Sequence, residues 1–129
     1  MPTTSLTGPT GWWLPAVASA RNADEVAFER ERLRAGLMVT AVADAGGVPV
    51  GAGSHQPVGP VSEVVGIGVL PAYRRRGIGA ALTAYLTADA LSRGARTVFL
   101  SAGDARIARV YEGVGFRRVG TACAGEPPA

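Results

Sequence analysis

The sequence predicts a single domain (1–129) of the α/β class, in which helices flank a mixed, mostly antiparallel sheet. Three observations support this prediction. The 129 residues are enough for one domain with a sizeable core. Segments with strand and helix patterns follow one another in the order βββαβαβ after one leading helix. The helix between the third and fourth strands requires these two strands to run parallel.

Caps, turns and hydrophobic spacing delimit the expected elements. Asn22, with Glu25 three residues later, has the spacing of a capping box and predicts a helix over 22–35. Strands are expected over 37–44, 48–55, 61–69, 97–101 and 116–123, and further helices over 79–93 and 104–114. Residues 1–20 are rich in Pro, Gly, Thr and Ser, so we expect them to be poorly structured or to form an interface.

The stretch 61–82, VSEVVGIGVLPAYRRRGIGAAL, is the centre of the predicted fold. Its first nine residues are rich in β-branched side chains and end before Pro71, which is typical of a buried central strand. Three arginines, a Gly-Ile-Gly sequence and the start of a helix follow. A glycine-containing loop that enters a helix presents unpaired N–H groups and partial positive charge, so this junction suits a pyrophosphate.

This junction resembles the signature of the GNAT superfamily, the acyl-CoA-dependent N-acetyltransferases. The family pattern is Arg or Gln, two residues, Gly, one residue, and Gly or Ala, and it stands here as Arg74-Arg75-Arg76-Gly77-Ile78-Gly79. The resemblance covers roughly 37–121, including the sequence Tyr-Glu-Gly-Val-Gly-Phe at 111–116. It implies a V-shaped split between the two parallel central strands. The chain departs from the family pattern at both ends, where we expect an abbreviated fold with one helix before the sheet and one strand after the last helix.

Other structures for this loop stay open. A P-loop needs a lysine after its last glycine, and all thirteen basic residues of this chain are arginine. A dinucleotide fingerprint needs a strand directly before its first glycine and a small residue at the third glycine position, where Leu82 stands here. A plain turn with a solvated arginine cluster is the remaining alternative.

The resemblance implies that acetyl-CoA is the co-substrate. It assigns the pantetheine arm to the main chain of Ile67, Gly68 and Val69, and the thioester oxygen to the Val69 N–H, which would stabilise developing charge. The pyrophosphate is assigned to Arg74, Arg75, Arg76, Gly77, Ile78, Gly79 and Ala80. From the residues themselves, Gly66 and Gly68 indicate a bulge or a close backbone approach, or glycines that are simply tolerated near a strand end.

Two residues are candidates for proton transfer. An amine with a pKa of about 10 is mostly protonated at neutral pH, so a base must remove its proton, and the resemblance assigns this role to Glu63. The resemblance also makes Tyr111 the acid that protonates the departing thiolate, with Asp104, seven residues earlier, where the family has Asn. Glu63 could instead face solvent or pair with an arginine, and Tyr111 could be a core aromatic residue.

Composition gives expectations for nucleic-acid binding, location and the single histidine. The net charge of +3 is modest, and three of the arginines belong to the proposed phosphate site, so nucleic-acid binding is not expected. The sequence shows no membrane span or signal peptide, and its single cysteine, Cys123, fits a reducing compartment, so a cytoplasmic location is expected. The only histidine, His55, is expected to be exposed, or else to line the acceptor pocket.

The function predicted from the sequence is direct transfer of acetyl from acetyl-CoA to a primary amine, with no metal. The acceptor could be a small metabolite, an antibiotic-like amine, a protein N-terminus or a lysine. The alternative is a non-catalytic acyl-CoA-binding module. A homodimer is expected, because a partner subunit would cover both the Trp12-Trp13 pair and an unfinished sheet edge.

Overall fold

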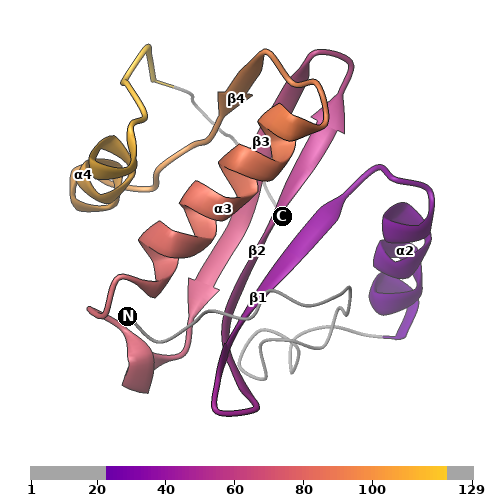
Figure 1. The fold of residues 1–129 in the computed structure, drawn as a ribbon, viewed down its shortest axis with the longest axis horizontal. Coiled ribbons are helices and arrows are strands. Elements are labelled where there is room, and N and C mark those ends of the chain that lie inside the picture. The colour runs from indigo at the N-terminus through magenta and orange to yellow at the C-terminus, as the bar shows by residue number, and fades with distance from the viewer. Residues whose placement is uncertain (1–22, 122–129) are drawn as a thin grey trace, which may run out of the picture.

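The computed structural model describes residues 23–121, which form a four-stranded mixed sheet with helices around it (Figure 1). The strands lie across the sheet in chain order, and they are β1 (Val39–Ala45), β2 (Val48–Val58), β3 (Val61–Val69) and β4 (Thr97–Phe99). β1–β2 and β2–β3 pair antiparallel, and β3–β4 pair parallel, which confirms the expected fold class. The expectations for 1–20, Asn22 and Cys123 lie outside the described residues.

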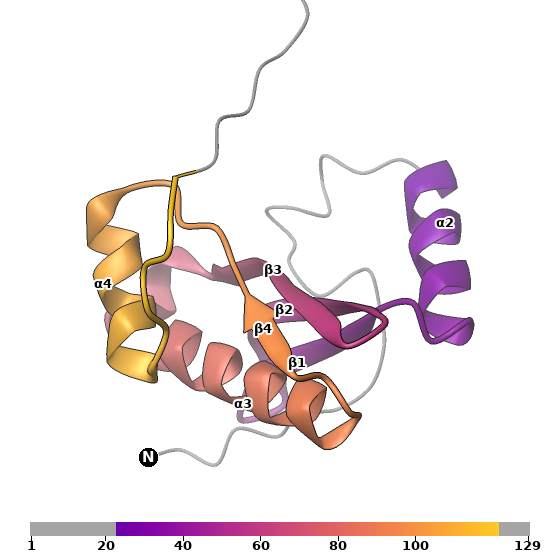
Figure 2. The ribbon, with the colours of Figure 1, turned by 90° about the horizontal axis from the view of Figure 1, so that it is seen from above.

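The helices lie on different sides of this sheet. α3 (Ile78–Ser92) covers one face, where Leu82 and Leu86 are fully buried against side chains of β1, β2 and β3. This is the expected face of the helix, with apolar residues spaced four apart. α2 (Ala23–Arg34) lies beside β1, and α4 (Ala105–Val114) lies on the β4 side (Figure 2). Within 23–121, no helix is both long and apolar enough to cross a membrane.

The turn between β1 and β2 is a two-glycine hairpin turn, as the sequence predicts. Gly46 and Gly47 have φ values of 60° and 88°, the left-handed region that such tight turns require. The Asp44 carboxylate accepts a 3.1 Å hydrogen bond from the Gly47 N–H and fixes this conformation. The turn therefore sets the register that carries β2 back along β1.

The parallel pairing of β3 with β4 is short. It consists of Val61 with Thr97, Ser62 with Val98 and Glu63 with Phe99. β3 then continues for six residues to Val69, while β4 ends at Phe99. Beyond Glu63, β3 has β2 on one side and no ladder partner in β4 on the other, which is the expected split.

A β-bulge lies in the part of β3 that pairs with β2 but has no partner in β4. Ser54 pairs with Val65 and Ala52 pairs with Gly68, so Gly53 of β2 lies opposite two residues of β3. One of these is Gly66, whose φ of 66° is in the left-handed region. The bulge expected from the glycines of this strand is confirmed at Gly66.

The expected strand over 116–123 is wrong for its described part, because 116–121 contain no strand. The end of α4 explains the difference. Gly115 closes the helix with a φ of 122°, and the Phe116 N–H donates to the Tyr111 carbonyl at 3.1 Å. This bond holds Phe116 against the helix end rather than beside β4. Val119 further on is 88% exposed, so no packing supports a strand there.

Side chains of β3 and α3 occupy the space beside Gly53 of β2. A Cβ at this position would clash with the Ile67 side chain and would lie 3.0 Å from Leu86 Cδ1. We therefore expect Gly53→Ala to destabilise the domain by about 1–3 kcal/mol, seen as a lower melting temperature. Gly113→Ala in α4 is the control, because its Cβ meets nothing within 4 Å and alanine favours helix. An unchanged melting temperature for Gly53→Ala would contradict this packing.

Candidate functional site

The N-terminus of α3 presents unpaired amide groups. Its N-cap is Gly77, with φ 78°, which supplies no capping side chain, and the first turn holds no acidic residue. The first intrahelical hydrogen bond runs from the Ala81 N–H to the Gly77 carbonyl at 3.0 Å. Helix geometry therefore leaves the N–H groups of Ile78, Gly79 and Ala80 without an intrahelical acceptor. These donors, at the positive end of the helix dipole, form a site for an anion.

The three arginines before this helix occupy different positions. The Arg74 Nε donates a 3.1 Å hydrogen bond to the Val69 carbonyl, which ties the loop to the end of β3. The Arg76 guanidinium lies over the Tyr73 ring, 5.2 Å from its centroid. Arg75 has a φ of 62° and is the only non-glycine residue within 23–121 with positive φ. The loop is thus anchored at both sides of a strained residue.

The end of β3 directs backbone donors into the split. The Leu70 N–H donates to the Val50 carbonyl at 2.8 Å, so it faces β2. Because backbone direction alternates along a strand, the N–H groups of Val69 and Ile67 face the open side, and the main chain of Gly68 faces β2. Of the three residues assigned to the pantetheine arm, two therefore present donors to the split.

The loop 74–77, which leads into α3, and the end of β3 adjoin one another. A Cβ built on Gly79 would lie 3.8 Å from the nearest side-chain atoms of both Ile67 and Val69. The structure thus brings the predicted pyrophosphate and pantetheine residues together. An alanine would also fit at this position in ordinary van der Waals contact.

Glu63 lies where the two parallel strands separate. It is paired with Gln56 of β2 and Phe99 of β4, and it is partly buried. Its neighbours Ser62 and Val64 are buried on the α3 side, so the Glu63 side chain belongs to the opposite face. The strand rise places it roughly 13 Å from Ile67 and roughly 20 Å from Val69.

Tyr111 and Asp104 line one cavity of about 930 Å³ between β4, α4 and the segment that follows α4. Burial raises the pKa of the Tyr111 phenol above 10.0, so the hydroxyl keeps its proton at neutral pH. The Tyr111 and Phe116 rings meet edge to face, with centroids 6.4 Å apart. The Asp104 carboxylate accepts the Ile107 N–H at 2.8 Å, so it caps α4. Glu63 does not line this cavity.

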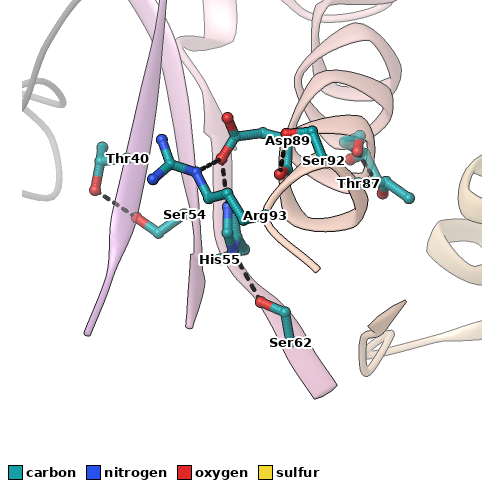
Figure 3. A network of polar contacts seen from close by, with 9 residues as sticks. Thr40, Ser54, His55, Ser62, Thr87, Asp89, Ser92 and Arg93 are labelled. Carbon is teal, nitrogen blue, oxygen red and sulfur yellow. Dashed lines mark hydrogen bonds and ion pairs between the residues drawn. The ribbon is translucent and has the colours of Figure 1, made fainter. Parts of the chain in front are cut away.

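His55 is not exposed, and that prediction is wrong. It is fully buried, and its imidazole lies between β3 and α3 (Figure 3). Its Nδ1 is 2.8 Å from the Ser62 Oγ, and its Nε2 is 2.7 Å from an Asp89 carboxylate oxygen. That oxygen also accepts a 2.7 Å hydrogen bond from the Arg93 Nε. We call these four residues the His55 cluster.

The Asp89 carboxylate fixes one proton of the His55 cluster. A carboxylate can only accept, so the His55 Nε2 carries a proton and donates it to Asp89, while the His55 Nδ1 shares a hydrogen bond with the Ser62 hydroxyl. The order Ser, His, Asp is that of a hydrolase triad. However, Ser62 is only 1% exposed, so a substrate cannot reach it, and the cluster is structural. The sequence signal for it is Asp89, which lies seven residues after Leu82 on the buried face of α3.

Metal-ligating groups do not converge in the described part of the chain. Within 23–121, no group of three or more His, Cys, Asp or Glu residues is placed to hold a metal ion.

Comparison with known proteins identifies one family. A model of the acetyltransferase (GNAT) family matches residues 10–116. None of the curated proteins matches the sequence significantly.

Several solved structures have a similar fold. A putative acetyltransferase from Agrobacterium tumefaciens has a TM-score of 0.80 at 20% identity, covering 95% of this chain and 99% of its own. The aminoglycoside N-acetyltransferase AAC(6')-Iy in complex with CoA has a TM-score of 0.75 at 20% identity, covering 97% and 100%. Glucosamine-6-phosphate N-acetyltransferase from Arabidopsis thaliana has a TM-score of 0.77 at 14% identity, covering 96% and 98%.

The His55 cluster makes the free energy of unfolding depend on pH in the acidic range. Burial opposes ionisation of Asp89, but its hydrogen bonds to His55 and Arg93 outweigh this and lower its pKa below 3.8. A lowered pKa gives stability that is present above pH 3.8 and lost as the pH falls through the lower folded value. We expect Asp89→Asn to cost about 1–2 kcal/mol at pH 7 and to flatten the acid loss in urea titrations between pH 5 and 2. Asp24→Asn, at an exposed position on α2, should change neither. An equally steep acid loss in Asp89→Asn would exclude Asp89 as its source.

Proposed function

Because the chain belongs to the GNAT family of acetyltransferases, we propose that it transfers acetyl from acetyl-CoA directly to a primary amine. One observation carries this proposal. The open side of β3, with the N–H groups of Ile67 and Val69, leads into the uncapped N-terminus of α3. A ligand with an extended arm that contains amides and ends in a pyrophosphate would need backbone hydrogen-bond partners along the arm and an anion site at its end.

Binding of acetyl-CoA is supported by the chemistry of both parts. The pyrophosphate would accept hydrogen bonds from the N–H groups of Ile78, Gly79 and Ala80, with Arg75 and the anchored Arg74 and Arg76 supplying positive charge. The pantetheine amides would pair with the open backbone of β3. The similarly folded AAC(6')-Iy has been crystallised in complex with CoA, which agrees with this assignment.

The chemical step requires the attacking nitrogen to lose two protons and the departing sulfur to gain one. A base removes the first proton from the ammonium group, the amine attacks the thioester carbonyl, and the resulting oxyanion is stabilised by a backbone N–H. Collapse of this intermediate breaks the C–S bond and releases the CoA thiolate, which takes a proton from the acid, and the second proton of the attacking nitrogen passes back to that acid. Glu63 is the proposed base and Tyr111 the proposed acid. The thioester oxygen stays assigned to the Val69 N–H, and the Ile67 N–H, which is nearer to Glu63, is the second backbone donor in the split. Glu63 would act through water.

The roles of Glu63 and Tyr111 are supported by position rather than by shared contacts. Glu63 is at the point where the split opens, and the Tyr111 hydroxyl stays protonated at neutral pH because burial raises its pKa. A protonated phenol can donate its proton to the departing CoA thiolate, which supports Tyr111 as the proposed acid.

A homodimer and a cytoplasmic location stay predictions. The outer edge of β4 has no strand partner among the described residues, and Phe99 of that strand is 44% exposed. A second subunit at this edge would satisfy the backbone and cover the apolar side chain.

The anion site can be tested at Gly79. Acetyl-CoA should raise the melting temperature of the wild type, and Gly79→Glu should abolish this rise because a carboxylate would occupy the pyrophosphate position. Gly79→Ala is the matched control, since its Cβ fits against Ile67 and Val69 at 3.8 Å and adds no charge. Retained stabilisation by acetyl-CoA in Gly79→Glu would place the cofactor elsewhere.

The base can be tested by the pH dependence of Glu63→Gln. We expect kcat/KM to fall roughly 10²-fold near neutral pH and to recover at high pH, where the amine is already deprotonated. Release of CoA thiol measures the rate, and melting temperature separates a loss of fold from a loss of catalysis. A pH-independent defect would remove Glu63 from proton transfer. If the wild type binds acetyl-CoA but releases no thiol with any amine, the chain is a non-catalytic acyl-CoA-binding module.

A further inference from the structure

A second, smaller pocket lies on the face of the sheet away from α3. Its volume is about 180 Å³, equivalent to about six water molecules, which suits a single small ring or a short branched chain. α2, β1, β2 and β3 all contribute to its walls. The lining residues are Glu29, Met38, Thr40, Ser54, Gln56, Val65 and Gly66.

The polar wall of this pocket consists mainly of uncharged groups. Thr40 and Ser54 are cross-strand partners, and their hydroxyls are 2.8 Å apart (Figure 3). When two hydroxyls share one hydrogen bond, the pair still has one O–H to donate and several lone pairs to accept. Gln56 adds an amide that can both donate and accept. Such groups are suited to the hydroxyls of a ligand.

The charge near this pocket is negative. Glu63 is directly opposite Gln56 in the β2–β3 ladder, on the same face of the sheet. Side chains of directly opposed residues have Cβ atoms about 5 Å apart, so Glu63 adjoins the pocket. Among the described residues that line the pocket, none is a lysine or an arginine. A cation is therefore favoured over an anion.

We propose that this pocket binds the acceptor, and that the acceptor is a small hydroxylated amine of the amino-alcohol or amino-sugar class. The inference rests on the proposed acetyl transfer. Glu63 would attract the ammonium group, the Thr40–Ser54 pair and Gln56 would bond the hydroxyls of the ligand, and Met38 and Val65 would contact its C–H faces. An aliphatic lysine side chain or an unsubstituted ring would leave the polar wall unpaired, which costs binding energy.

The pocket is well placed for the chemistry. Gly66, at the bulge of β3, forms part of its wall, and Ile67 with its N–H directed into the split is the next residue. An amine in the pocket would thus approach the thioester from the face opposite α3. The bulge interrupts the ladder where the two ligands have to meet.

A matched pair of amines tests the inference on the whole chain. 4-Aminocyclohexanol and cyclohexylamine share one ring and are both protonated at pH 7, and they differ by a hydroxyl. Calorimetry should give a dissociation constant about 3–10-fold lower for 4-aminocyclohexanol, corresponding to one net hydrogen bond. CoA-thiol release should follow the same order, with an Nα-acetyl-lysine amide weaker than the amino alcohol. Equal binding of the pair, or preference for the lysine compound, would overturn the inference.

Variants locate the site. Ser54→Ala and Thr40→Val should each remove the preference for 4-aminocyclohexanol while leaving cyclohexylamine binding unchanged. Glu63→Gln should weaken both amines roughly 10-fold in calorimetry, as expected for a charge-assisted contact. Glu31→Gln, at an exposed position on α2, is the matched control and should change nothing. If Glu31→Gln weakens binding as much as Glu63→Gln, or if both hydroxyl variants keep the preference, the pocket is not the site.

The two proposals fail in different ways. Calorimetry reports amine binding without turnover, and thiol release reports turnover. Selective binding of the hydroxylated amine without thiol release would support the pocket and refute acetyl transfer. Thiol release with no preference between the matched amines would support acetyl transfer and refute the inference about the acceptor.

Discussion

The parallel pairing between β3 and β4 ends after Glu63 and Phe99, and this limit shapes the rest of the site. Backbone N–H and C=O groups that leave a ladder must find other partners, because unpaired buried polar groups are costly. In β3 the groups on the open side face a split that a ligand or water can enter. The same strand then leads through an arginine-rich turn into the uncapped end of α3. One continuous segment therefore offers amide donors followed by an anion site.

Separate contacts hold the two ends of β3 in place. At its start, the His55 cluster joins Ser62 to Asp89 of α3, next to the last residue that pairs with β4. At its end, the Leu70 N–H bonds to Val50 and the Val69 carbonyl accepts from Arg74. The bulge at Gly66 lies between these anchors. The strand is thus held at both ends and irregular between them, which is the arrangement that a preorganised site at the bulge would need.

The sequence was sufficient for the features that depend on local patterns. The β-branched run of β3, the four-residue spacing of Leu82 and Leu86, and the cap at Asp104 each follow from chemistry within a few residues. The junction between β3 and α3 was predictable from its proline and glycines, and its role as a phosphate site stays a prediction. The positions assigned to cofactor and catalysis agree with this geometry, and their roles stay predictions.

Features that depend on long-range contacts could not be predicted from the sequence. A histidine beside Gln56 and Pro57 gives no sign that Asp89, 34 residues later, will cover it. The strand expected after α4 had an acceptable composition, but the Phe116 N–H bonds to the end of that helix. The facing hydroxyls of Thr40 and Ser54 depend on the β1–β2 register, which the composition of either strand alone does not specify.

The arginines and Glu63 lie far apart along β3, which suits the two proposed substrates because their charges have opposite signs. Acetyl-CoA carries several negative charges, whereas an amine acceptor is a cation before it reacts. The arginines follow the end of β3, and Glu63 stands near its start, a distance of roughly 20 Å along the strand. This is more than twice the screening length of about 8 Å at physiological ionic strength. Under the proposed function, acetyl-CoA would therefore meet the arginines and the amine would meet Glu63, and the two would come together only at the bulge, where the backbone of Gly66 and Ile67 is neutral.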